Sequence, residues 1–427
     1  MTKSKMDIRD NVLFFGGVST VKLVEQYQTP LYVMDETTIR NNCKKFQKIF
    51  SGNNNKVAYA GKAFLTLEMC KILNDEKMYL DVVSGGELFT AKKAKFPMER
   101  IYFHGNNKTN EELQMGVDYQ VGTFVVDNFS EVLKINQLAK QKNIIQNILL
   151  RVNPSINVKT HDYIKTGHGD SKFGFNLFTN EIVDAINYIK ELTNVEFIGL
   201  HCHIGSQLFD IQSYEEEVQI LFSLVKRIHV ETGVIVEEVN LGGGFGIAYL
   251  EEEQPPAIEE FCGAILKKAI KEASELEITL PRLVIEPGRS IVGEAGIMLY
   301  QVGYIKDIPN IKKIVSVDGG MADHIRPALY QAKYHCVVAN RINSNIKEKV
   351  TVVGKCCESG DVILNDVVLP KIQEGDLIVL RCTGAYGYSM VSNYNKIRKP
   401  AVVMVRDKEA RLICKRQSYE QLIEDEL

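Results

Sequence analysis

Short apolar, β-branched segments recur along the first part of the chain, and helical stretches separate most of them. The segments begin near Val57, Tyr79, Ile101, Thr123, Ile148, Phe197, Val236 and Leu283. Apolar residues spaced three or four apart predict helices at 66–75, 87–94, 130–140, 181–191, 213–232 and 258–276. Strands that alternate with helices in this way predict a (β/α)8 TIM-type barrel, although the fifth interval holds a long polar loop. A doubly wound parallel sheet is the alternative.

The rhythm changes after residue 289, where short strand-like segments follow one another without long helices. These segments lie at 298–305, 313–317, 335–338, 350–353, 376–380 and 401–405, and two more lie at 11–15 and 31–33. A chain of 427 residues is long enough for two domains. We therefore expect a β/α-barrel domain at 35–292 and a β-rich, sandwich- or barrel-like domain at 1–34 and 293–427.

The composition limits which kinds of molecule the protein is expected to bind and where it is expected to be located. A net charge of -3 with 25% charged and 45% hydrophobic residues is typical of a soluble protein and argues against a nucleic-acid partner. No apolar run is long enough to cross a membrane, and no apolar stretch follows the amino-terminal lysines as in a secretory signal. We expect a cytoplasmic protein. Its 9 cysteines, an odd number without C-x-x-C spacing, predict reduced thiols.

A single lysine follows the first predicted barrel strand. Lys62 comes directly after the segment that begins at Val57. The carboxyl ends of barrel strands face the catalytic mouth, where a lysine partly removed from water has a lowered pKa and can attack a carbonyl. An ordinary solvated lysine is the alternative.

Other polar residues and glycines end the later strands. A glycine run at 242–244 lets backbone N–H groups approach an anion, and Ser206 and Gly288 at neighbouring strand ends could donate to the same phosphate. A plain tight turn is equally consistent with the glycines. Asp81 and His104 end two further strands.

Two histidines and a glutamate suggest more specific chemistry. His201 and His203 are two residues apart on a strand, so their side chains share a face. They could bind zinc with further ligands, stack on an aromatic cofactor, or be hydrogen-bonded core residues. Glu286 follows a buried strand, and a buried carboxylate needs a cationic partner. A protonated pyridine nitrogen would serve, as would a salt bridge to Arg289 or another cation. We expect no metal.

Five motifs in order carry a resemblance to a known family. They are Tyr59-Ala-Gly-Lys62-Ala, His201-Cys-His203-Ile-Gly-Ser206, the glycines from Gly242, Glu286-Pro-Gly-Arg289 and Cys357-Glu-Ser-Gly-Asp361. Together they resemble the fold-type III pyridoxal phosphate decarboxylases, and among these the diaminopimelate decarboxylases. The resemblance runs from about residue 29 to about residue 400.

The resemblance implies a barrel joined to a β-domain and a head-to-tail homodimer with shared active sites. It implies that Lys62 binds pyridoxal 5'-phosphate covalently, that His203 stacks on its ring and that Glu286 pairs with the ring nitrogen N1. The remaining cofactor contacts would come from Asp81, Ser206, Gly243, Gly244, Gly288, Arg289 and Tyr386. Cys357, supplied by the β-domain of the other subunit, would be the proton donor. A buried turn residue is the alternative for Cys357, and Cys356 is a weaker candidate for the donor.

The implied reaction converts meso-2,6-diaminopimelate to L-lysine and CO2, the last step of lysine biosynthesis. The substrate's far carboxylate needs a cation and its far amine an anion. Arg289, Arg326 and Tyr330 would bind the far carboxylate and Glu358 the far amine, and Tyr386 would also contact the substrate. The alternatives are a related decarboxylase of ornithine, arginine or carboxynorspermidine, a racemase of the same fold type, a zinc hydrolase, or an inactive regulatory relative. Arg326 could also be a plain surface arginine.

Overall fold

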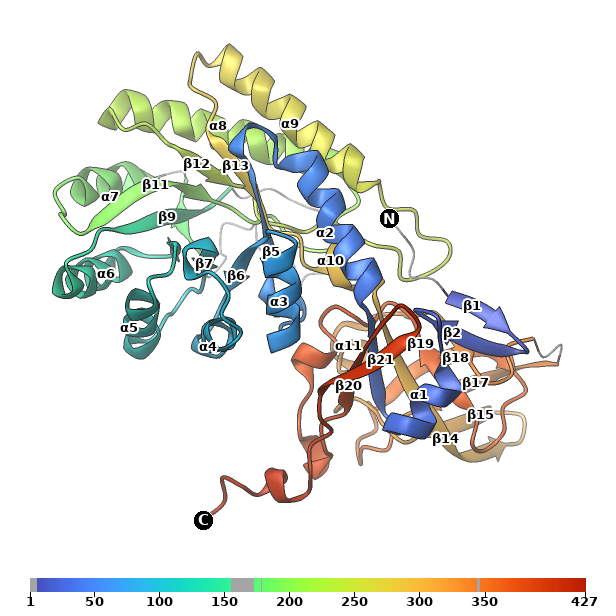
Figure 1. Ribbon diagram of the computed structural model, residues 1–427. Helices are drawn as coiled ribbons and strands as arrows, with labels where there is room; N and C mark the ends of the chain where they lie inside the picture. Colours follow the sequence, from blue (N-terminus) through green and yellow to red (C-terminus); the bar gives the residue numbers. More distant parts are fainter. Residues whose placement is uncertain (1–5, 155–172, 178, 344–345) are drawn as a thin grey trace. The chain divides into compact units, whose positions relative to one another are not determined.

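The computed structural model describes residues 6–154, 173–177, 179–343 and 346–427. These residues form two compact units (Figure 1). The first unit contains residues 43–246 and 255–288. The second contains the described residues up to 42, with 247–254 and 289–427.

Parallel strands form a closed barrel in the first unit. They are β5 (Lys56–Ala60), β6 (Tyr79–Val82), β7 (Ile101–Phe103), β8 (Thr123–Val126), β9 (Gln146–Asn153), β11 (Val195–His201), β12 (Glu238–Asn240) and β13 (Arg282–Ile285). Each strand pairs with the next in this order, and β13 pairs with β5 to close the ring. The short β10 (Phe175–Asn176) extends β9. The predicted (β/α)8 barrel is confirmed, and the doubly wound alternative is wrong.

Helices cover the outside of the barrel, as Figure 1 shows. They are α3 (Leu67–Asp75), α4 (Gly85–Lys93), α5 (Asn110–Tyr119), α6 (Phe129–Lys142), α7 (Glu181–Ile189), α8 (Ile211–Thr232) and α9 (Ile258–Glu275). The helix α2 (Glu36–Phe50) begins in the second unit and ends in the first. The six predicted helices are present, and sequence analysis missed α2 and α5. In α5 only Leu113, Gly116 and Val117 are buried, so the apolar pattern is weak, and the capping box between Thr109 and Glu112 is its clearer signal.

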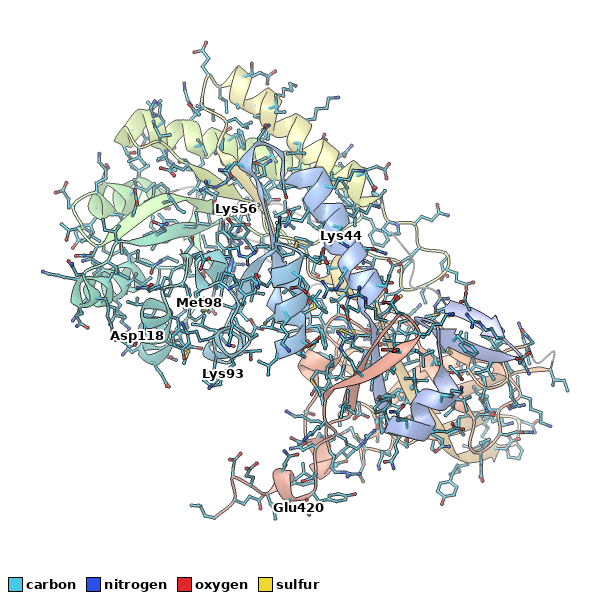
Figure 2. All side chains as sticks on the ribbon, in the orientation of Figure 1. Lys44, Lys56, Lys93, Met98, Asp118 and Glu420 are labelled. Atoms are coloured by element: carbon cyan, nitrogen blue, oxygen red, sulfur yellow. The ribbon has the colours of Figure 1, made fainter. Side chains whose placement is uncertain are left out.

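Side chains fill the barrel, and a charged network lies at its amino end. Lys56, Glu238 and Arg282 are each the first residue of a strand (Lys56 is labelled in Figure 2). Glu238 is fully buried and accepts from Lys56 Nζ, Arg282 Nε and the Tyr102 hydroxyl at 2.7, 2.7 and 2.6 Å. This network lies at the end opposite to Lys62, so it supports the fold rather than the chemistry.

The second unit is built on a mixed sheet with the strand order β18-β17-β15-β14-β4-β20-β21. Its strands are β4 (Leu31–Asp35), β14 (Gly296–Ile308), β15 (Lys312–Val317), β17 (Lys347–Val353), β18 (Val362–Pro370), β20 (Ala401–Arg406) and β21 (Glu409–Cys414), and β16 (Cys336–Val338) and β19 (Leu377–Leu380) join it through β14. A further three-stranded sheet consists of β1 (Met6–Arg9), β2 (Val12–Phe15) and β3 (Val18–Ser19), which α1 (Thr20–Tyr27) follows. The β-rich prediction is confirmed.

Buried aliphatic side chains from distant parts of the chain form the core of this unit. Leu31 and Val33 of β4 pack with Ile297 and Leu299 of β14 and with Val403 of β20. Four strands of this unit were not predicted from the sequence: the short β1 and β3, and β18 and β21, whose apolar runs are broken by polar residues or are only partly buried. Among the described residues, no helix has the length and apolar character needed to cross a membrane.

We expect Glu238→Gln to destabilise the barrel because it leaves two cations at the amino end without their buried carboxylate. The loss should be about 3 kcal/mol, measured as a lower midpoint of urea unfolding. The matched control is Glu237→Gln, a change at the adjacent exposed glutamate, which should shift stability by less than about 0.5 kcal/mol. Equal midpoints for the two variants would contradict this account of the network.

Candidate active site

Glu286 is the centre of the polar residues at the carboxyl end of the barrel. It directly follows β13 and is 6% exposed. Its Oε1 accepts from Asn240 Nδ2 at 2.7 Å and lies 2.9 Å from His104 Nε2. Its Oε2 lies 3.2 Å from His201 Nε2. Burial alone would raise the pKa of Glu286, but His104 and His201 outweigh it and hold the pKa well below the usual range. The carboxylate is therefore ionised.

Of these partners, Asn240 has no role predicted from the sequence. It is the last residue of β12, buried beside the glycine run. A buried amide at the carboxyl end of a barrel strand, two residues before three glycines, was the available signal.

The two histidines of β11 and the turn after it have different environments. His201 meets His104 edge to face at 4.6 Å, and burial lowers its pKa to about 3, so the ring is neutral. His203 Nδ1 accepts from the Gly243 N–H at 3.3 Å. Burial, followed by the charge of Lys62, holds the pKa of His203 well below its usual value. His203 is therefore a neutral ring whose orientation is set by the glycine run.

The glycine run at 242–244 packs so closely that side chains are excluded. A Cβ on Gly243 would lie 2.1 Å from the Glu286 backbone oxygen, and one on Gly244 would lie 2.5 Å from that of Gly205. Gly242 and Gly244 have φ angles of +61° and +105°, which favour glycine. Gly288 also sits tightly, with its Cβ position 3.0 Å from that of Ala60. Backbone from the ends of β5, β11, β12 and β13 is thus brought together at one edge of the barrel.

Lys62 lies in the 3-10 turn Gly61–Ala63 directly after β5. Its side chain is exposed in this chain, which differs from the expectation that the barrel partly removes it from water. Asp81, the third residue of β6, is buried, and its Oδ1 has no hydrogen-bond partner among the described residues. Burial, the largest cause, raises the pKa of Asp81.

Glu87 is a second carboxyl group beside the lysine turn. Its Oε2 accepts from the Val83 N–H at 2.8 Å and lies 3.4 Å from the position of a Cβ on Gly61. Burial raises the pKa of Glu87 to about 7, while the Val83 hydrogen bond opposes the shift. The sequence predicts no role for this residue, because only the fold brings it to the turn that carries Lys62.

In the second unit, predicted substrate-binding residues form an arginine–tyrosine cluster. Arg326, the first residue of α11 (Arg326–Tyr330), is buried, and its guanidinium lies over Tyr330 at 5.3 Å and over Tyr386 at 5.6 Å. Arg289, the first residue of α10 (Arg289–Val292), lies over Tyr386 at 4.8 Å and donates to the Tyr249 hydroxyl. Within the described ranges, no carboxylate forms an ion pair with Arg326. The surface alternative for Arg326 is wrong.

The turn that contains Cys357 forms a separate group. Cys357 is exposed and its N–H donates to Asn395 Oδ1 at 2.7 Å, so the buried-turn alternative is wrong. Cys356 is buried, and its N–H donates to Asp361 Oδ2 at 2.8 Å. Asp361 Oδ1 accepts from the Met321 N–H at 2.6 Å. The buried Asp361 carboxylate therefore holds this turn, and the Tyr394 hydroxyl lies 3.3 Å from Glu358 Oε2.

Comparison with known proteins identifies the family. Residues 36–293 match the model of the pyridoxal-dependent decarboxylase family, pyridoxal binding domain. The chain is 46% identical to the diaminopimelate decarboxylase of Bacillus subtilis, over 97% of this chain and 95% of the relative, and 47% identical to that of Bacillus methanolicus, over 95% and 94%. The crystal structure of diaminopimelate decarboxylase from M. jannaschii has a TM-score of 0.93 at 38% identity, covering 99% of this chain and 97% of that one. The chain belongs to the pyridoxal-dependent decarboxylases.

The residues at the carboxyl end of the barrel strands, here called the rim, fit the cofactor of this pyridoxal-dependent decarboxylase. An ionised, buried carboxylate suits a protonated pyridine nitrogen, and glycines that exclude side chains suit a phosphate. The same rim also contains a group of possible metal ligands, since the atoms of His104, His201 and Glu286 lie within 4.8 Å of one another. The zinc alternative thus has three candidate ligands, although Asn240 already donates to one Glu286 oxygen. Metal analysis of the purified protein would test the alternative.

Glu87 predicts a pH dependence of stability. Its folded pKa of about 7 lies above the usual 4.5, so the folded state holds a proton that the unfolded state releases, and stability falls as pH rises from 4.5 to about 7. We expect Glu87→Gln to remove this loss of stability. The melting temperature of the variant minus that of the parent should therefore increase as pH rises across that interval. Glu111→Gln, at an exposed position, is the control. A difference in melting temperature between Glu87→Gln and the parent that does not change with pH would contradict the raised pKa of Glu87.

Asp361 predicts an effect on the protection of Cys356. In Asp361→Asn, one of the two backbone N–H groups would face an amide N–H instead of an acceptor, which should cost about 1–3 kcal/mol and loosen the turn. We expect faster alkylation of Cys356 by iodoacetamide, followed by peptide mass spectrometry. Asp366→Asn, at an exposed position, should leave Cys356 as protected as in the parent. Unchanged protection in Asp361→Asn would show that the carboxylate does not hold the turn.

Proposed function

We propose that this chain decarboxylates meso-2,6-diaminopimelate to L-lysine and CO2 with pyridoxal 5'-phosphate, as the last step of lysine biosynthesis. The observation that carries the proposal is Arg326, a buried cation among tyrosines without a carboxylate partner in the described residues. Near full-length similarity to diaminopimelate decarboxylases supports it. A solved relative from M. jannaschii is described as a complex with L-lysine, at 38% identity and a TM-score of 0.93.

The polar residues of the rim indicate where the cofactor would bind. When bound, pyridoxal phosphate supplies an electron sink for the electrons left when CO2 departs. Lys62 would bind the cofactor covalently, and Glu286 would pair with N1. The remaining contacts would come from Asp81, His203, Ser206, Gly243, Gly244, Gly288, Arg289 and Tyr386.

Two features of the rim support these roles. Because His104 and His201 hold the pKa of Glu286 low, this carboxylate can keep a proton on a neighbouring pyridine nitrogen. Because His203 is a neutral ring anchored to Gly243, it can lie against an aromatic ring without adding positive charge.

Charge supports the choice of substrate. Arg326, with Arg289, Tyr330 and Tyr386, would bind the far carboxylate, because guanidinium groups pair with carboxylates in a planar, two-bond geometry. Glu358 would bind the far amine. Ornithine lacks the far carboxylate, so an enzyme for ornithine would leave Arg326 buried without an anion.

We propose Cys357 as the proton donor, acting in the site of the other subunit of a head-to-tail homodimer. Its exposure on a turn tied down by Asp361 supports this role, since a thiol that serves another subunit must be accessible. We also propose domains at 35–292 and at 1–34 with 293–427, which the family match at 36–293 supports. A cytoplasmic location completes the proposal.

The test measures CO2 release from meso-diaminopimelate, L-ornithine, L-lysine and L-arginine with added pyridoxal phosphate. We expect release from diaminopimelate alone and a loss of at least about 10³-fold in Lys62→Ala, because the covalent site is gone. Arg326→Gln should raise KM for diaminopimelate more than it lowers kcat. Lys56→Ala, at the other end of the barrel, should lose stability rather than chemistry.

Each other result points to a different function. Release from ornithine or arginine would favour a related decarboxylase and overturn the roles of Arg326 and Glu358. No release, with normal cofactor absorbance, would favour a regulatory relative. A change of configuration without CO2 would favour a racemase, and activity that depends on bound zinc would favour a hydrolase.

A further inference from the structure

The guanidinium of Arg326 is held by a residue outside the proposed site. Arg326 Nε donates to the Tyr334 hydroxyl at 2.7 Å. Tyr334 is 3% exposed. The helix α11 ends because Gln331 adopts a φ of 53°, and its N–H returns to the Arg326 carbonyl. The chain therefore turns back after one short helix and brings Tyr334 beside the arginine that began it.

Tyr334 is itself fixed by two other aromatic rings. It meets His324 edge to face at 4.6 Å and Tyr249 at 5.3 Å. His324 is buried, and burial, followed by the charge of Arg326, lowers its pKa to about 3, so it adds no charge beside the arginine. Tyr334 thus has little freedom to move its hydroxyl away from Arg326.

This contact determines which edge of the guanidinium can meet an anion. A guanidinium has five N–H donors in one plane and can bind a carboxylate side-on through Nε or end-on through its two terminal nitrogens. Because Nε already donates to Tyr334, the two terminal nitrogens remain to bind a carboxylate end-on. Since the guanidinium is planar, holding Nε also fixes the direction in which these two nitrogens point. A tyrosine hydroxyl satisfies Nε without neutralising the charge, which a carboxylate would do.

We propose that Tyr334 is a positioning residue that sets substrate specificity by presenting the end-on edge of Arg326 to the far carboxylate. The inference rests on the proposed function, since it assumes that Arg326 binds this carboxylate. Tyr334 does not touch the substrate itself; it acts through Arg326.

The test compares two competitive inhibitors that differ by one carboxylate. L-lysine keeps the carboxylate that Arg326 would bind, and 1,5-diaminopentane lacks it. In Tyr334→Phe we expect the inhibition constant of L-lysine and the KM of meso-diaminopimelate to rise about tenfold. The reason is that Nε loses its hydrogen-bond partner and the guanidinium is no longer held in one orientation. The inhibition constant of 1,5-diaminopentane and kcat should stay within about twofold. Tyr304→Phe, the same change at a tyrosine that is 79% exposed, is the control.

A general packing effect would weaken both inhibitors equally in Tyr334→Phe, and that result would overturn the proposal. If Arg326→Gln does not affect the preference for L-lysine, the proposed role of Arg326 fails. If Arg326→Gln removes the preference and Tyr334→Phe leaves it intact, only the present inference fails.

A second variant keeps the test decisive if Tyr334→Phe folds poorly. Arg326→Lys keeps the charge but has no Nε for Tyr334 to hold, so it should lose the preference for L-lysine by a similar factor. Adding Tyr334→Phe to Arg326→Lys should then cause no further loss of that preference. A further tenfold loss in the double variant would show that Tyr334 acts independently of Arg326 and would overturn the proposal.

Discussion

The polar rim of the barrel depends on one buried carboxylate, that of Glu286. A carboxylate removed from water costs several kcal/mol unless it is paired and hydrogen-bonded. Asn240 comes from the neighbouring strand β12, His201 from β11, and His104 from the end of β7. These strands converge only when the sheet closes, so the ionised state of Glu286 is a property of the closed barrel.

The other acidic groups of the rim behave differently because they have fewer partners: Asp81 Oδ1 lies 3.6 Å from His104 Nε2, and Glu87 accepts from the Val83 N–H. Burial raises the pKa of both Asp81 and Glu87, and Asp81 has an oxygen without a hydrogen-bond partner among the described residues. The rim therefore combines one carboxylate held in its charged form with two that ionise less readily.

The second unit shows the opposite arrangement, in which positive charge is buried among tyrosines. Ring faces attract a guanidinium through their negative quadrupole, and hydroxyl groups accept its N–H bonds, yet neither removes its charge. Arg326 is therefore stabilised while it stays attractive to an anion. A lysine could not replace it, because an ammonium has no planar edge for Tyr334 to orient.

The pattern of apolar segments was sufficient to predict the barrel, its strands and the β-rich second unit, because the strand and helix periods are local properties of the sequence. Polar residues at strand ends also predicted Lys62, His203, the glycines and Glu286 as site residues, since barrel enzymes keep their chemistry there. Asn240 had such a signal but was passed over, and Glu87, Tyr249 and Tyr334 could not be found in this way. Each becomes important only through a neighbour far away in sequence or across a turn, so their hydrogen bonds and pKa values were decided by the packing of the folded chain.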